Sequence, residues 1–340
     1  MILVIGGAGY IGSHMVKYLR RRNEPVLVMD NLENGHRPAI LDADFVAGDL
    51  RRPDDLDRVF REHSVDCVVH FAAYASVGDS VINPSKYYDN NVNGCLHLLE
   101  AMRAHGIRQL VFSSSAAVYG EPQVIPIPED HPKNPTNPYG ETKWVMERML
   151  QWYGQAYGIR SVSLRYFNAA GADPEGEIGE DHHPEEHLIP VVLLTALGQR
   201  DQIKVFGTDW DTPDGTCIRD YIHVWDLAEA HWLAIQALRH GGNTTAYNLG
   251  NGQGFSVNQV IRAVEQITRL PVRVESAPRR AGDPARLVAG NARIRADLGW
   301  TPQYPALESI IQHAWNWRQR NPNGYPTKTD PENPASGHRS

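Results

Sequence analysis

The glycine-rich segment near the start of the chain constrains the fold more than any other feature of the sequence. Gly6-Gly7-Ala8-Gly9-Tyr10-Ile11-Gly12 directly follows the apolar run Met1–Ile5 and precedes an amphipathic stretch. Glycines at this spacing allow a tight strand-to-helix turn and a close approach of the backbone to a pyrophosphate, which the first N–H groups of the helix bind. The segment therefore predicts the opening strand and helix of a dinucleotide-binding unit.

Short β-rich runs and helical patterns alternate through the first half of the chain. The expected strands are Ile2–Ile5, Pro25–Asp30, Asp44–Ala47, Cys67–Phe71, Gln109–Ser113 and Ser161–Arg165. The expected helices are Ile11–Arg22, Pro53–His63, Pro84–His105 and Tyr139–Tyr157. This alternation predicts the α/β class, with a doubly wound parallel Rossmann-type sheet covered by helices on both faces.

The alternation of expected strands and helices ends near residue 168, where Gly, Pro and Asp become frequent. We expect residues 1–167 to form the cofactor-binding domain. A helix over Trp225–His240 and a strand over Ala246–Leu249 are expected to return to it, so that residues 225–249 belong to this domain. A smaller α/β substrate lobe is expected from 168–224 and 250–326, with Ser256 capping a helix that runs to about Arg269. The polar tail, 327–340, is expected to be disordered.

Composition and net charge disfavour several classes of binding partner and structural site. A formal net charge of -7 provides no basic surface for nucleic acid, and no apolar run approaches the ~20 residues that span a bilayer. Cys67, Cys95 and Cys217 stand far apart, which disfavours a disulfide framework or a zinc site and fits a reducing, cytoplasmic location. The His- and Glu-rich segment His182–His187 is interpreted as a solvated loop or a substrate contact, and no metal is expected.

An acidic residue ends the second expected strand. Asp30 lies 18 residues after Gly12, where a carboxylate hydrogen-bonds the adenosine ribose hydroxyls and repels a 2′-phosphate. Asn31 and Leu32 follow, so no arginine comes next to accommodate that phosphate. These residues predict NAD rather than NADP. Asp49, after the third strand, is expected either near the adenine or as a helix cap.

A tyrosine and a lysine four residues apart, Tyr139 and Lys143, share one face of an expected helix. A free phenol has a pKa of about 10 and is a poor base near neutral pH, but a nearby ammonium and a positive nicotinamide ring favour the tyrosinate. Ser115 ends a run of three serines at the carboxyl end of a strand, where open α/β sheets place their ligands. The three side chains predict redox chemistry at a substrate hydroxyl that Ser115 holds and Tyr139 deprotonates.

Longer motifs add a family resemblance that runs from Ile2 to about Tyr325. The glycine-rich start, Ser113–Gly120 and the Tyr139–Lys143 pair resemble the extended short-chain dehydrogenase/reductase superfamily. More specific resemblance, to the UDP-glucose (UDP-galactose) 4-epimerases, is carried by Tyr87–Gly94, Leu164–Asn168, Asp214–Val224 and Arg279–Asp283.

The resemblance implies an isomerase of galactose metabolism that inverts C4 of a UDP-hexose reversibly through a transient 4-keto sugar. Tyr139 would take the C4 hydroxyl proton while the hydride passes to NAD, and Ser115 would hydrogen-bond the C4 oxygen. The keto sugar would then rotate and regain the hydride on its opposite face. A homodimer through Pro84–His105 and Tyr139–Tyr157 is also implied.

The motifs and the resemblance together assign the site residues. Those expected at the cofactor are Gly6, Gly9, Tyr10, Ile11, Gly12, Asp30, Asn31, Asp49, Leu50, Phe71, Ala72, Asn90, Ser113, Tyr139, Lys143 and Tyr166. Those expected at the UDP-sugar are Ser115, Tyr139, Asn168, His187, Leu188, Val205, Phe206, Arg219, Tyr221, Arg280, Asp283 and Leu287. Among the latter, guanidinium groups suit a diphosphate because they bind it through two parallel hydrogen bonds.

Three residues depart from the family pattern. Ala75 stands where some members carry a lysine facing the cofactor, so tight retention of NAD does not follow. His187 stands where some members have Asn, which puts that nucleotide contact in doubt. Leu287 stands where some members have a bulky tyrosine beside the 2-substituent of the sugar, which predicts room for an N-acetyl group and activity on UDP-N-acetylglucosamine.

The sequence disfavours two other functions and leaves a third open. A sugar-nucleotide 4,6-dehydratase needs an Asp-Glu pair directly after the serine or threonine, where this chain has Ala116-Ala117. Epimerisation of UDP-xylose or UDP-arabinose stays open, because contacts to C6 are not legible in the sequence. A non-catalytic NAD-binding regulator on the same fold is disfavoured, since neither Tyr139 nor Lys143 is lost.

Overall fold

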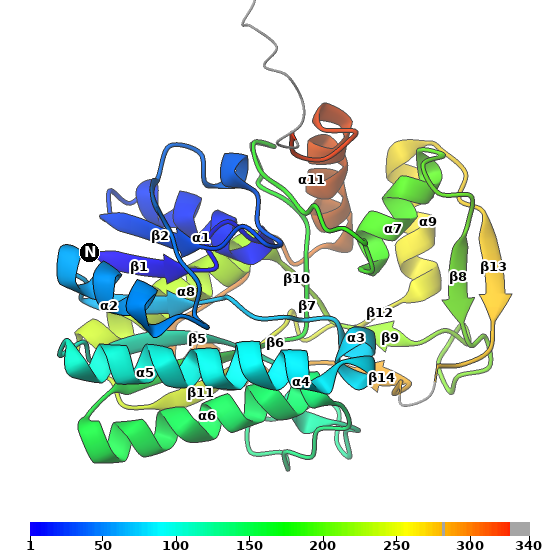
Figure 1. Ribbon diagram of the computed structural model, residues 1–340. Helices are drawn as coiled ribbons and strands as arrows, with labels where there is room; N and C mark the ends of the chain where they lie inside the picture. The colour runs from blue at the N-terminus through cyan, green and yellow to red at the C-terminus, as the bar shows by residue number, and fades with distance from the viewer. Residues whose placement is uncertain (281–282, 327–340) are drawn as a thin grey trace, which may run out of the picture.

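The computed structural model describes residues 1–280 and 283–326, so the expectation of disorder over 327–340 lies outside the described residues. Its centre is a parallel seven-stranded sheet with the order β11-β6-β5-β4-β1-β2-β3 (Figure 1). The strands are β1 (Ile2–Ile5), β2 (Val26–Asp30), β3 (Asp44–Ala47), β4 (Cys67–His70), β5 (Gln109–Ser115), β6 (Arg160–Tyr166) and β11 (Thr245–Leu249). The doubly wound parallel sheet is therefore confirmed.

Helices cover both faces of this sheet, and the strand sequences explain why. Ile2 and Val4 of β1 pack on one apolar cluster while Leu3 and Ile5 pack on another, because successive side chains of a strand point to opposite faces. The first cluster lies under α1 (Tyr10–Arg20) and α8 (Val224–Arg239). The second lies under α2 (Pro53–Glu62), α5 (Gly94–Ala104) and α6 (Pro138–Tyr157).

The helix expected over Pro84–His105 is interrupted. It consists of α4 (Pro84–Tyr87), a π-helical segment (Tyr88–Asn93) and α5. A π-helical turn shifts the phase of the side chains, which an amphipathic pattern alone does not reveal, and such turns occur frequently at functional sites. The remaining short helices of this half are α3 (Val77–Ile82), a 3₁₀ turn η1 (Arg37–Ile40) and a 3₁₀ turn η3 (Ala116–Tyr119).

The second lobe is built from separated segments, on the right in Figure 1. Its apolar core lies between three helices and a two-stranded parallel sheet. These elements are α7 (Leu188–Ala196), α9 (Val257–Thr268), α11 (Leu307–Arg320), β8 (Ile203–Phe206) and β13 (Val274–Ala277). Shorter elements complete the lobe and its junction with the sheet: β7 (Asn168–Ala170), β9 (Ile218–Arg219), β10 (Tyr221–His223), β12 (Phe255–Ser256), β14 (Arg286–Leu287) and α10 (Ala292–Leu298).

The cap expected for α9 is present, because the Ser256 hydroxyl accepts from the Gln259 N–H and the Gln259 side chain accepts from the Ser256 N–H. Cys67, Cys95 and Cys217 are free thiols. In the part of the chain that the structure describes, no helix combines the length and the apolar character needed to cross a membrane.

Candidate active site

The glycine-rich turn is a cradle that side chains would fill. Gly6 has a φ of +78°, and a Cβ there would lie 2.5 Å from the Ala72 nitrogen. A Cβ at Gly12 would clash with the Gly6 carbonyl oxygen. Gly9 is the N-cap of α1 without a side-chain cap, so the first N–H groups of the helix remain available to an anion. These features fit the pyrophosphate of a dinucleotide.

Asp30 lies at the end of β2 against this cradle. Its Oδ2 accepts from the Ala8 N–H at 3.0 Å and its Oδ1 accepts from the Leu32 N–H at 2.8 Å. Burial raises the pKa of Asp30, and the backbone N–H donors oppose that rise. Each oxygen of a carboxylate has a second lone pair, so Asp30 can also accept from ribose hydroxyls.

Asp49 is held beside Asn31, at the ends of two neighbouring strands. The Asn31 amide donates to Asp49 at 3.0 Å, and the Arg51 guanidinium donates at 2.6 Å and keeps the pKa of Asp49 well below its usual range. Arg51, which the sequence analysis missed, also pairs with Glu33 at 2.9 Å. Asp49 does not cap α2 with its side chain, because the N-cap residue there is Arg52. Arg51 is committed to two carboxylates, which agrees with selection against a 2′-phosphate.

The first turn of α6 brings Tyr139 to the end of β5. The helix begins with Pro138, and the Asn137 side chain caps it by accepting from the Gly140 N–H at 2.9 Å. A Cβ at Gly140 would lie 2.5 Å from the Ala117 oxygen, so only glycine allows this close approach. Burial raises the pKa of Tyr139, and a hydrogen bond with Ser115 opposes that rise. The predicted base and the predicted hydroxyl-binding serine are thus in contact.

Lys143 lies one helical turn further along α6 and is buried. Its Nζ donates to the Ser113 carbonyl at 2.7 Å and lies 5.9 Å from the Tyr139 ring centroid. It also lies 5.0 Å from the centroid of the Phe112 ring. Burial lowers the pKa of Lys143 to about 8. The ammonium therefore lies near the Tyr139 ring.

Three residues expected to border the cofactor lie at or directly after the ends of β4 and β6. The N–H groups of Phe71 and Ala72 both donate to the Ile5 carbonyl, at 2.8 and 3.2 Å. Tyr166, at the end of β6, is bonded through its hydroxyl to His231 Nε2 at 2.7 Å. Asn90 is half-buried on the π-helical segment, whereas Leu50 is buried in the core. Their contacts to the cofactor stay predictions.

Asn91, the neighbour of Asn90, is a positioning residue that the sequence analysis missed. Its fully buried amide donates to the Tyr74 carbonyl and to Thr142 Oγ1, each at 3.1 Å, and accepts from the Tyr74 N–H at 3.0 Å. It therefore fastens the loop after β4 to α6 at the residue before Lys143. The hydrophobic pattern of the sequence does not predict the π-helical segment that directs Asn91 inward.

A buried ion pair contacts the run of serines that ends β5. Glu147 and Arg165 lie 2.6 Å apart, and the Ser114 hydroxyl donates to Glu147 at 2.5 Å. Glu147 follows Lys143 by four residues, so helical periodicity was a usable signal for it.

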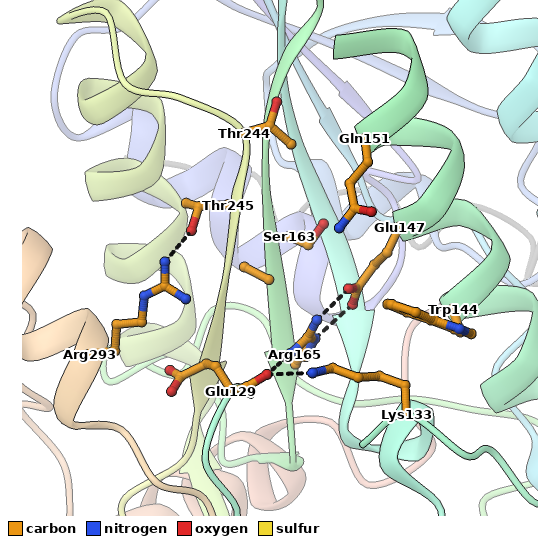
Figure 2. Close-up of a pocket in the computed structure, with 11 residues that line it drawn as sticks. Glu129, Lys133, Trp144, Glu147, Gln151, Ser163, Arg165, Thr244, Thr245 and Arg293 are labelled. Carbon is orange, nitrogen blue, oxygen red and sulfur yellow. Dashed lines mark hydrogen bonds and ion pairs between the residues drawn. The ribbon is translucent and has the colours of Figure 1, made fainter. Parts of the chain in front are cut away.

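A cavity of about 270 Å³ opens on the other side of this pair, between α6, β6 and β11 (Figure 2). None of the predicted site residues lines it. The side chains of Lys133 and Arg165 both donate to the Glu129 carbonyl, so two of its positive groups already have partners. The chemistry predicted from the sequence thus lies outside this cavity, at the carboxyl edge of the sheet.

The residues expected at the nucleotide fall into two groups. Arg280 lies over the Phe206 ring, with its guanidinium carbon 3.8 Å from the centroid. Arg219 donates to the Ile218 and Pro284 carbonyls at 2.9 Å and lies 3.7 Å from Asp283. The other group is enclosed. The side chains of Val205 and Tyr221 are buried in the core of the lobe, so Val205 offers only its backbone.

Asp220 is a third residue, after Arg51 and Asn91, that the sequence analysis did not single out. Its fully buried carboxylate accepts from the N–H groups of Asn251, Gly252 and Ala289 at 2.7–3.0 Å. Burial raises its pKa to about 6. Its carbonyl also accepts from the Asn168 amide at 3.1 Å. Asp220 therefore connects three distant segments of the chain.

The remaining substrate candidates border these elements. Leu287 is half-buried against Val118 and Tyr119, in the turn that follows Ser115. Leu188 is the first residue of α7. His187 directs its Nδ1 to Glu180 Oε1, at 2.7 Å. Their roles at the nucleotide or the sugar stay predictions.

Comparison with known proteins identifies the family. Residues 2–250 match the NAD dependent epimerase/dehydratase family. The chain belongs to this family. A UDP-glucose 4-epimerase of Halalkalibacterium halodurans is 55% identical over 96% of this chain and 98% of its own length. A crystal structure of a UDP-glucose 4-epimerase superposes with a TM-score of 0.94 at 54% identity, covering 96% of this chain and 99% of the other. The Brucella ovis UDP-glucose 4-epimerase in complex with NAD has a TM-score of 0.91 at 47% identity, covering 92% and 97%.

The family confirms the resemblance drawn from the motifs. As a member of an NAD-dependent family with a cradle that fits the pyrophosphate, the chain uses the cofactor that Asp30 and the glycines predict. The match over nearly the whole length means that the second lobe belongs to the same architecture.

Proposed function

We propose that this member of the epimerase/dehydratase family interconverts UDP-glucose and UDP-galactose and so serves galactose metabolism. The observation that carries the proposal is the convergence of Tyr139, Ser115 and the buried Lys143 at the sheet edge beside the glycine cradle. Relatives that align over nearly the whole chain are UDP-glucose 4-epimerases, which selects this reaction among those of the family.

Each residue has a role that follows from its position. Bound NAD would supply the group that accepts the hydride from C4 of the sugar and returns it. Tyr139 would take the proton of the C4 hydroxyl and later return it, while Ser115 orients the same oxygen. The charge of Lys143, 5.9 Å from the Tyr139 ring, would favour the tyrosinate. No net proton is consumed, because the base that removes it also restores it.

The nucleotide half of the substrate would lie in the lobe formed by residues 168–224 and 250–326. The exposed guanidinium of Arg280 and the neighbouring Arg219 are suited to the diphosphate, with the Phe206 ring beside the base. Residues 1–167 and 225–249 would hold the cofactor. A fragment that keeps NAD binding while it lacks UDP binding would test this division.

UDP-N-acetylglucosamine is the second candidate substrate, and Leu287 favours it. Leu287 borders the turn after Ser115, and leucine is shorter than the tyrosine of some relatives. We expect Leu287→Tyr to lower kcat/KM for the N-acetyl sugar by about 10-fold, because the larger side chain would fill the room for the N-acetyl group and small changes in pocket size alter discrimination by about 1–3 kcal/mol. The unmodified sugar serves as the control. An unchanged ratio of the two substrates would remove Leu287 from the specificity assignment.

A proton-NMR time course of UDP-galactose with purified protein and no added NAD tests the function directly. Parallel samples contain UDP-N-acetylglucosamine and UDP-arabinose. Conversion to UDP-glucose supports both the epimerase and a cofactor that is retained during purification. Conversion only after NAD is added points to weak retention near Ala75. No conversion under either condition contradicts the proposal for these hexoses and moves it to whichever parallel sugar reacts.

We also propose a cytoplasmic homodimer through the neighbouring helices α5 and α6 (Figure 1). Each helix exposes an apolar side chain: Leu96 is 39% exposed and Trp152 is 62% exposed. Light scattering after size exclusion should give twice the chain mass for the wild type and about one chain mass for Trp152→Glu. A monomeric wild type would contradict the dimer, and cell fractionation tests the location.

A further inference from the structure

A cluster of two histidines and two glutamates lies in the loop that connects β7 to α7. One ligand atom from each of Glu180, His182, Glu185 and His187 lies within 4.8 Å of all the others. His182 Nδ1 lies 3.3 Å from Glu180 and 3.6 Å from Glu185. His187 Nδ1 lies 2.7 Å from Glu180 Oε1 and 3.4 Å from Glu185 Oε1. A zinc tetrahedron with bonds of about 2.0–2.1 Å has edges of about 3.3 Å. The three separations that join Glu180 Oε1, Glu185 Oε2 and the two Nδ1 atoms, at 2.7, 3.3 and 3.6 Å, bracket that length.

The atoms that face one another have no hydrogen-bond partner among residues 1–280 and 283–326. Glu180 is only 5% exposed, and its Oε1 is unpartnered, as are His182 Nδ1 and Glu185 Oε2. The other oxygen of Glu185 accepts from the Glu186 and His187 N–H groups at 3.0 and 2.9 Å. That anchor turns Oε2 toward His182. Lone pairs that converge in this way repel unless a proton on an imidazole or a bound cation lies between them.

A neighbouring acidic cluster shows what a satisfied arrangement looks like in the same loop. Asp173, Glu175 and Glu177 surround the Lys17 ammonium at 2.5–2.9 Å. No lysine or arginine in the described part of the chain forms an ion pair with the carboxylates of Glu180 or Glu185. The first cluster has its cation within the chain, and the second has none besides its own histidines.

We propose that Glu180, His182, Glu185 and His187 bind a zinc ion. Two carboxylates balance the charge of a divalent cation, and two neutral imidazoles complete a four-coordinate shell of nitrogen and oxygen. Zinc accepts this donor set, whereas magnesium and calcium prefer oxygen alone. Four protein ligands leave no open position, so the ion is structural rather than catalytic. This proposal replaces the interpretation of His182–His187 as a solvated loop.

The position of the cluster gives the ion a defined effect. Tyr10 of the glycine-rich segment donates to the Gly171 carbonyl at 2.7 Å, and its ring centroid lies 6.2 Å from that of His182. His187 is the N-cap residue of α7, directly before the first residue of that helix. Bound zinc would therefore fasten the cofactor cradle to the first turn of a helix of the substrate lobe.

Metal analysis of the full-length protein tests the proposal. The wild type is stripped with EDTA, reloaded with Zn²⁺ or Mg²⁺, desalted and measured by plasma mass spectrometry. We expect about one zinc and no magnesium per chain. His182→Ala and Glu185→Gln should retain less than a tenth of that zinc. His183→Ala is the matched control, because His183 is adjacent but lies outside the cluster, and it should retain zinc fully.

Cobalt replacement and thermal unfolding keep the test decisive if a variant fails to fold. Co²⁺ in the stripped wild type should show the intense visible bands of four-coordinate cobalt. Zn²⁺ should raise the Tm of the stripped wild type, because an ion that binds only the folded state stabilises it. No zinc after reloading, equal zinc in all four proteins, or an unchanged Tm overturns the proposal. The cluster would then consist of protonated histidines paired with the two glutamates.

Discussion

The two halves of the proposed site are built in different ways. At the carboxyl edge of the sheet, Ser115, Tyr166 and Asp30 each end a strand of five to seven residues within one parallel ladder. In the nucleotide lobe, β9, β12 and β14 have two residues each and pair across 36–38 and 68 positions of sequence. The proposed chemistry thus rests on strands of five to seven residues within one sheet, whereas the proposed substrate recognition rests on strands of only two residues.

The difference implies that substitutions in the catalytic half should lower turnover, whereas substitutions in the nucleotide half should weaken substrate binding. The sharpest test is Tyr139→Phe, which removes the base while the ring still fills its place. We expect kcat to fall by about 10³-fold, within the range for loss of a general base. Binding of the reduced cofactor NADH, followed by its fluorescence, should be unchanged. Turnover near that of the wild type would break the assignment and, with it, the contrast between the halves.

The pH dependence of turnover tests Lys143 in the same half. Burial lowers its pKa to about 8, so the ammonium loses its proton above that pH. The neutral amine no longer favours the tyrosinate, and kcat should fall about 10-fold per pH unit on the alkaline side. Ser115→Ala should lower kcat at every pH without moving the alkaline limb of the profile, because it leaves Lys143 in place. A limb that begins near pH 10 would show that the lysine titrates as an exposed one does.

The contrast also explains which residues were predictable. The glycines, Asp30, Ser115, Tyr139 and Lys143 lie in short motifs whose strand or helix context is legible in the same stretch of sequence. The doubly wound parallel sheet followed from the alternation of strands and helices. The cofactor and the family were recognisable for the same reason, since each depended on contiguous residues.

The residues that escaped prediction act through contacts distant in sequence. Asn91 faces inward because of a π-helical segment that hydrophobic periodicity does not register. Arg51 matters through its pairing with Glu33, which a local motif does not reveal. Glu180 lies outside the His-rich run, so the four converging ligands became visible only in three dimensions.

Substitution of Asp220 has the smallest expected effect of these variants, and it tests the nucleotide half specifically. Both of its oxygens accept from backbone N–H groups. In Asp220→Asn an amide NH₂ must face a donor in either orientation, which costs about 1–3 kcal/mol. We expect a lower Tm and a KM for the UDP-sugar that rises several-fold, because β9 and β14 carry Arg219 and Leu287.

Asp226→Asn is the matched control for this effect. Asp226 is also fully buried, its pKa is also raised to about 6 by burial, and it accepts from the Gln303 and Tyr304 N–H groups at 2.8 and 3.1 Å. It lies in α8, against the sheet, rather than among the short strands of the lobe. A similar loss of Tm with an unchanged KM is expected. If both variants raise KM equally, general loosening explains the effect, and the short strands have no special part in recognition.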